Sequence, residues 1–227
     1  MLRACLAAAF LLIGSWAEAA TELRCPAFPA PSGQVAMVAE SMQINGVPMT
    51  IKELSSKEPP QAVLQFYRQR WKGNRFGSFE YPLDGWLGAI ATMDGQCFYT
   101  VQVQPGGQGS RALLAVSGRR NPSGRNPGAG FPKMSGSKIF NDMDHRDGVK
   151  TARTVMLSND FSVTSNANYY REALAADGWT ALIDRPVDTP RGKQYVMVMK
   201  RGVEEASLTI GQSGSGTAVI ANIVDRP

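Results

Sequence analysis

The chain has 227 residues, of which 43% are hydrophobic and 19% are charged. This balance is typical of a globular protein with one large or two small domains, and it excludes a disordered chain. The net charge of +5 falls well short of the dense Lys/Arg surface of a dedicated nucleic-acid binder, so we expect no nucleic acid as a partner.

Residues 1–19 predict a signal peptide. Arg3 gives a positive start, an apolar run follows over 4–13, and Ala17-Glu18-Ala19 is a small-x-small cleavage site. Because Cys5 precedes the apolar run, it cannot be a lipid-anchoring cysteine at that site. No later run is long enough for a transmembrane helix, so we expect a periplasmic or secreted protein without a transmembrane segment.

Two cysteines remain after removal of the signal peptide, Cys25 and Cys97. An even number of cysteines in an oxidising compartment favours a disulfide between them. The long loop that this bond closes would stabilise the fold by roughly 4 kcal/mol in the chain-entropy treatment. A pair of free thiols is the alternative.

Residues 20–34 contain three prolines and no apolar periodicity, which predicts an extended N-terminal arm. The first structured unit follows over 35–117. Its expected elements are strands over 35–44 and 47–54 around the Asn45-Gly46 turn, a helix over 61–72, and strands over 86–93, 97–104 and 111–117.

Between the helix and the third of these strands lies a polar and aromatic insertion over 74–85. It contains Phe76, Phe79 and Tyr81 among glycine, proline and charged residues. Three aromatic rings are hard to bury within so short a loop, so we expect them either to fold back on the core or to form a partner-binding loop.

Residues 118–136 predict a linker. The segment is rich in Gly, Pro, Ser and Asn, a composition that buries too little apolar surface to offset the entropy of ordering it. Arg119, Arg120 and Arg125 give it a basic character. These arginines could bind an anionic partner, and a solvated spacer is the alternative.

The second unit, over 137–227, repeats the pattern of the first. Three groups of residues support the repeat: Asn45-Gly46-Val47 with Asp147-Gly148-Val149, Leu54-Ser55 with Leu157-Ser158, and Phe66-Tyr67-Arg68 with Tyr169-Tyr170-Arg171. The expected elements are strands over 138–144 and 149–157, a helix capped by Ser162 or Thr164, and strands over 194–200, 206–211 and 217–224.

This pattern predicts an α+β protein. We expect two repeated ββαβββ units, each an antiparallel five-stranded sheet with one helix packed across it, because the apolar face of each helix needs a sheet to cover. The two units could pack on each other about a pseudo-twofold axis or move independently on the linker.

No catalytic set is evident. His145 is the only histidine and lies among acids, with Asp142 and Asp144 nearby, but a zinc site usually needs three or four nitrogen or sulfur ligands. The serines of 211–216 lie in a glycine-rich turn and not in a nucleophile elbow. We therefore expect no enzyme activity, no metal and no cofactor.

The order of strands and helix, the Phe/Tyr-Tyr-Arg helix and the glycine-rich final hairpin resemble modules of exported bacterial proteins. They are also similar to the tandem helix-grip domains of the periplasmic C component of the outer-membrane β-barrel assembly machine. The resemblance implies a non-catalytic protein of the cell envelope that binds or assembles others. A carrier of a small apolar or anionic ligand, held in a groove between helix and sheet, is the alternative.

Overall fold

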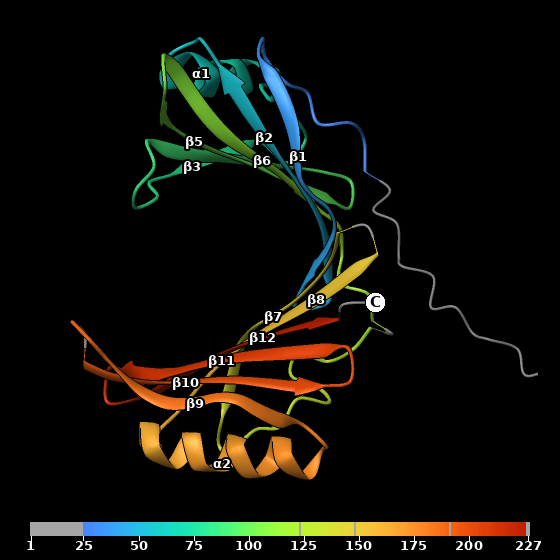
Figure 1. Cartoon of the computed structure of the whole chain (residues 1–227). Coiled ribbons are helices and arrows are strands. Elements are labelled where there is room, and N and C mark those ends of the chain that lie inside the picture. The colour runs from blue at the N-terminus through green and yellow to red at the C-terminus, as the bar shows by residue number, and fades with distance from the viewer. Residues whose placement is uncertain (1–24, 123, 148, 191, 226–227) are drawn as a thin grey trace, which may run out of the picture.

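The computed structural model describes residues 25–122, 124–147, 149–190 and 192–225 (Figure 1). The predicted signal peptide and residues 20–24 of the arm lie outside this part. The elements, in chain order, are β1 (Gln34–Ile44), β2 (Val47–Ser56), α1 (Pro60–Arg70), β3 (Ser78–Tyr81), β4 (Gly88–Asp94), β5 (Cys97–Gly106), β6 (Gly109–Ser117), β7 (Lys138–Asp147), β8 (Lys150–Asn159), α2 (Val163–Ala176), β9 (Thr180–Thr189), β10 (Gly192–Arg201), β11 (Glu204–Ser213) and β12 (Gly216–Asp225).

The strands form one antiparallel sheet of twelve, in the order β3-β4-β5-β6-β2-β1-β7-β8-β12-β11-β10-β9. The prediction of an α+β protein with two separate five-stranded sheets is therefore wrong. The described chain is mostly β, and its two helices have only 11 and 14 residues. The order of elements is nevertheless the same in the two halves, before and after residue 137.

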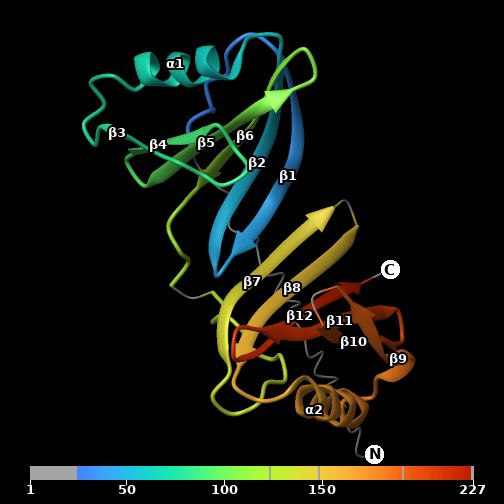
Figure 2. The same ribbon diagram turned by 90° about the vertical axis from the view of Figure 1, so that its left-hand side faces the viewer.

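The halves merge because β1 pairs with β7. Ser41–Ile44 lies antiparallel to Met143–Arg146 (Figure 2), which removes a free edge from each half. Asn45 extends this seam: its backbone N–H donates to the Asp142 carbonyl at 2.8 Å, and its side-chain oxygen accepts from the Asp142 N–H at 2.9 Å. Asn45 can do this because it has a positive φ of 52° in the predicted hairpin turn.

Each half also has a strand that the sequence did not indicate. β3 arises within the predicted insertion, and β9 follows α2 directly. An arginine of each helix holds the extra strand: Arg68 pairs with Glu80 of β3, and Arg171 pairs with Asp184 of β9. The repeated Phe/Tyr-Tyr-Arg sequence thus has a structural role, since the arginine ties the helix to the end of the sheet.

The two helices cover the outer side of the sheet (Figure 1). α1 begins at Pro60, directly after Pro59, where a missing N–H costs little. The Ser162 hydroxyl caps α2 by accepting from the Ser165 N–H. Tyr67 of α1 and Tyr170 of α2 are both completely buried at the centre of these interfaces. The sheet curves between them, so the molecule is a crescent whose inner side carries no helix.

A short segment with the pattern Phe-Pro-x-x-Ser-Gly precedes each half and packs beneath its helix. Phe28 of the arm lies with its ring centre 6.0 Å from that of Tyr67, and Phe131 of the predicted linker lies 5.8 Å from Tyr170. Phe131 is buried in the second core, so this part of the linker does bury apolar surface. The domain boundary over 118–136 stays a prediction.

The predicted disulfide between Cys25 and Cys97 is present, with an S–S distance of 2.01 Å. It ties the arm to the start of β5 and so holds Phe28 in the first core. No helix within the described ranges is long and apolar enough to cross a membrane.

The two buried tyrosines generate a stability prediction. The Tyr67 hydroxyl donates to the Pro29 carbonyl at 2.8 Å, whereas the Tyr170 hydroxyl is buried without a partner among the described residues. We expect Tyr67→Phe to lower the free energy of unfolding by about 1 kcal/mol, since it leaves the partly buried Pro29 carbonyl without its donor. Tyr170→Phe should be neutral or stabilising, and it serves as the matched control. Urea unfolding measures both, and equal losses would contradict the assignment.

Candidate functional site

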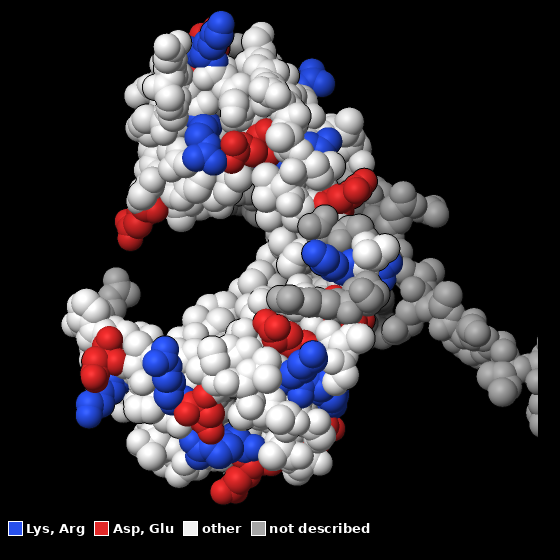
Figure 3. Space-filling view, in the orientation of Figure 1, with Lys and Arg blue, Asp and Glu red and all other residues white. Residues whose placement is uncertain are grey.

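Within the described part of the chain, no helix or strand covers the inner, concave face of the sheet. Side chains alternate between the two faces of a strand, so residues next to core positions point to the other face. Leu157 and Val219 are buried under α2, and their neighbours Met156 and Ile220 therefore lie on the concave face, opposite each other. Figure 3 shows the hollow between the two halves, and its wall is mostly free of charged residues.

In the first half this face is aromatic and aliphatic. Leu113 and Phe98 alternate with the buried Leu114 and Tyr99. Phe79 stacks on Phe98, with 6.0 Å between the ring centres, and is 50% exposed. A concave rim of aromatic rings thus lies at the β3 end of the sheet.

In the second half the same face is aliphatic and polar. Val196 and Val198 alternate with the buried Met197 and Met199 of β10. Ile220, which is 40% exposed, contributes the largest apolar side chain of β12 on this side. Serine and threonine side chains separate these residues, so the second half is less apolar than the first.

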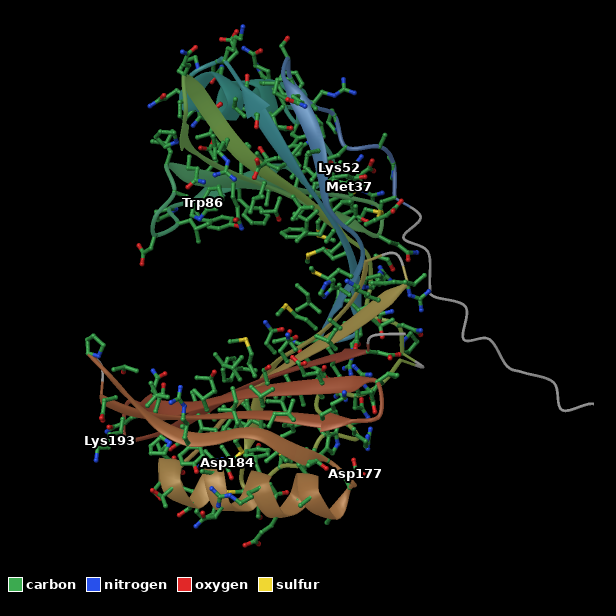
Figure 4. The ribbon with its side chains drawn as sticks, viewed as in Figure 1. Met37, Lys52, Trp86, Asp177, Asp184 and Lys193 are labelled. Carbon is green, nitrogen blue, oxygen red and sulfur yellow. A yellow bond between two sulfur atoms is a disulfide. The ribbon has the colours of Figure 1, made fainter. Side chains whose placement is uncertain are left out.

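Methionines join the two halves across the seam. Met42 of β1 lies directly opposite Met49 on one side and His145 on the other, and Met143 lies opposite Ile44. Met156 follows on β8. Figure 4 shows sulfur atoms along this inner wall, where no helix covers them. Methionine side chains are flexible and polarisable, so such a surface can adapt to partners of different shape.

The predicted aromatic partner-binding residues are only partly brought together. Phe79 and Tyr81 stack on each other at 6.4 Å and belong to the concave face through β3. Phe76 lies in the loop before β3 instead, exposed, with the Arg75 guanidinium 5.8 Å from its ring centre. Phe98, Met42 and Met156 were missed, because alternation within a strand does not say which face stays uncovered.

The predicted basic residues of the linker lie away from the concave face. Arg125 is bound to Asp144 and Asp142 on the outer side of the seam. Arg120 donates to the Asn126 side chain at 3.1 Å, and Arg119 is exposed. Arg125 therefore supports the fold, and its charge is already matched.

The acidic residues around His145 do not converge. Asp142 and Asp144 lie on the outer face of β7, whereas His145 lies on the concave face. Within the described residues, no group of three His, Cys, Asp or Glu could hold a metal ion.

Asp142 is the electrostatic centre of the seam. It is 3% exposed and accepts hydrogen bonds from Nε and Nη2 of Arg153, each at 2.9 Å, and from the Gly128 N–H at 2.7 Å. Burial opposes ionisation, but the contacts with Arg153, Gly128 and Arg125 outweigh it and hold the pKa of Asp142 below its ordinary value. Asp142 is therefore ionised at neutral pH and connects β7, β8 and the segment around Gly128.

Searches against models of known protein families, curated proteins and solved structures found no match.

Asp142 gives a prediction for the pH dependence of stability. Asp142→Asn leaves the partly buried Arg153 without its carboxylate and should lower the free energy of unfolding by about 3 kcal/mol at pH 7. Because the folded pKa lies below the unfolded value, this contribution is present above about pH 4 and is lost as the pH falls through the folded pKa. The difference between the variant and the unmodified protein should therefore shrink in acid.

Asp144→Asn is the control for this measurement. Asp144 is also paired with Arg125 but is exposed, so its substitution should cost less than about 1 kcal/mol. Chemical unfolding from pH 7 to pH 3 compares the three proteins. A loss at Asp142→Asn that stays constant with pH would contradict the electrostatic role.

Proposed function

We propose that this protein is a non-enzymatic, exported protein of the cell envelope that binds other polypeptides through the concave face of its sheet. In this role it is a protein-binding or assembly-accessory module. The observation that carries the proposal is the uncovered face itself, which is apolar, continuous over both halves and curved (Figure 3). Large exposed apolar surfaces of this kind mark interaction sites, because an isolated protein gains nothing from exposing them.

The composition of the face favours a polypeptide with an exposed apolar segment. Phe79 gives an anchor at the β3 end and Ile220 gives one within the second half, and the methionines around Met42 give an adaptable centre. Among the charged residues on this face, Glu53 and Arg111 neutralise each other in an ion pair, and Arg185 lies on the edge strand β9. A strongly charged partner would find little to pair with across the middle of the face.

The seam makes the face a fixed surface. The ladder between β1 and β7 and the bonds between Asn45 and Asp142 hold the two halves together. The ion pair with Arg153 of β8 fixes Asp142 within the second half. A surface that is already ordered loses less entropy when a partner binds. The same seam leaves the concave side free for contact.

The proposal also includes export of the protein from the cytoplasm and an origin of its two halves by duplication. The disulfide fits an oxidising compartment, and the predicted signal peptide over 1–19 points the same way. The shared order of elements and the two Phe-Pro-x-x-Ser-Gly segments support an origin of the halves by duplication.

Site-specific photo-cross-linking tests the proposal. Replacing Phe79 with p-benzoylphenylalanine places a reactive ring of similar shape on the concave face. In producing cells we expect it to form one or a few adducts of defined mass, because the face would be occupied by its partner. The cross-linked products are separated by electrophoresis and identified by mass spectrometry.

The matched control replaces Phe161, which is 42% exposed in the loop before α2. It should give no adduct of defined mass. Identical adducts from Phe79 and Phe161, or none from Phe79 and from a second concave position at Ile220, would contradict the proposed docking face.

A further inference from the structure

The second half contains a cavity of about 840 Å³ on the outer side of the sheet, at the C-terminal end of α2. Its apolar lining includes Phe131, Leu174, Trp179, Leu208 and Ile223, which belong to the second core or pack against it. This volume lies in the range typical of small-molecule sites. Most of its lining belongs to the outer face of the sheet, and at the seam it also includes Met42 and His145, which lie on the concave face.

In the first half a tyrosine fills the corresponding space. Tyr99 is the third residue of β5, and Ala206 is the third residue of β11, which has the same place in the order of elements. Tyr99 is almost completely buried, and its hydroxyl donates to the Pro26 carbonyl at 3.0 Å. Ala206 carries only a methyl group and lines the cavity.

The disulfide occupies a second part of that space in the first half. Cys97 begins β5, and Cys25 lies three residues before the phenylalanine of the arm. At the matching positions the second half has Glu204 at the start of β11 and Gly128 three residues before Phe131. Two sulfur atoms are thus replaced by a rim carboxylate and a residue without a side chain.

The wall of the cavity is built from side chains that hold one another. The Arg201 guanidinium lies 4.6 Å from the Trp179 ring centre, which is within cation–π distance. Arg201 also donates to Glu204 at 2.9 Å and pairs with Asp177 at the end of α2. These contacts fix Trp179 in position. Because Trp179 cannot move into the cavity, the cavity stays open and α2 does not collapse onto the sheet.

The charges around the cavity balance. Among the described residues that line it, arginines and carboxylates number four each. Three of the arginines are already bound to carboxylates: Arg125 to Asp144, Arg153 to Asp142, and Arg201 to Glu204. The fourth, Arg146, is exposed at the rim. An anion would have to displace the partners of the three paired arginines, so the rim beside Trp179 favours a ligand without net charge.

We propose that this cavity binds a small, uncharged amphipathic molecule. Its apolar body, of the size of one or two aromatic rings, would lie against Trp179 and Leu208 where Tyr99 fills the first half. Its polar groups would reach the ion-paired rim. The assignment does not require protein docking on the concave face, because Trp179 and Leu208 belong to the core on the outer side of the sheet.

The test uses N-phenyl-1-naphthylamine, an uncharged apolar fluorophore, titrated into the full mature chain with its disulfide intact. We expect saturable binding at one site, and at least tenfold weaker binding of 8-anilino-1-naphthalenesulfonate, a similar ring system with a negative charge. No saturable binding of the uncharged probe, or tighter binding of the anion, would overturn the proposal.

Two variants locate the probe. Ala206→Tyr introduces the side chain that fills the first half, and it should weaken binding at least tenfold. Ile223→Trp fills the cavity from a partly buried position and should do the same if Ala206→Tyr does not fold. Ile220→Trp, on the same strand but on the concave face, should leave the affinity unchanged. Loss of binding only in Ile220→Trp would move the site to the concave face and refute the assignment.

Discussion

The pairing of β1 with β7 is the constraint on which the rest of the structure depends. Only four residues of each strand take part, Ser41–Ile44 and Met143–Arg146, yet they turn two sheets into one. A ladder this short between two large halves needs support. The support comes from the outer side, where buried Asp142 binds Arg153 and the Gly128 N–H and exchanges backbone and side-chain bonds with Asn45.

The same seam divides the molecule into two functional sides. On the outer side the helices, the arm segments and the ion pairs satisfy apolar and charged groups, and the cavity beside Trp179 remains as an incompletely filled space. On the inner side none of the described elements covers the sheet, and Met42, Met49 and Met143 continue the apolar surface across the junction. Two separate sheets would have divided this surface into two smaller patches, each next to an unpaired edge strand.

Local signals in the sequence predicted the local structure. The Asn45-Gly46 turn, both helices and the Cys25–Cys97 bond follow from turn chemistry, apolar periodicity and cysteine number. The merged sheet could not be predicted from such local signals, because β1 and β7 are about a hundred residues apart in the chain. Pairing between edge strands also requires no particular sequence pattern in either strand. The concave face was missed for a related reason: alternation shows that a strand has two faces, but not which face the helix covers. The packing of Phe28 and Phe131, in contrast, could have been predicted from the sequence, because each begins a segment with the same Phe-Pro-x-x-Ser-Gly pattern.

The two halves fix equivalent segments by different chemistry. In the first half Cys25 anchors the arm through a covalent bond to Cys97, and Tyr99 bonds to the same segment. In the second half Gly128, at the position that matches Cys25, donates its N–H to Asp142, and Arg153 donates to the next carbonyl, that of Ala129. The covalent anchor responds to reduction, whereas the ionic anchor responds to acid, because it depends on an ionised Asp142. An ion pair anchors the segment of the second half, so that half needs neither a disulfide nor a tyrosine at the position of Tyr99 for stability. The volume that these groups fill in the first half can therefore remain open as a cavity in the second.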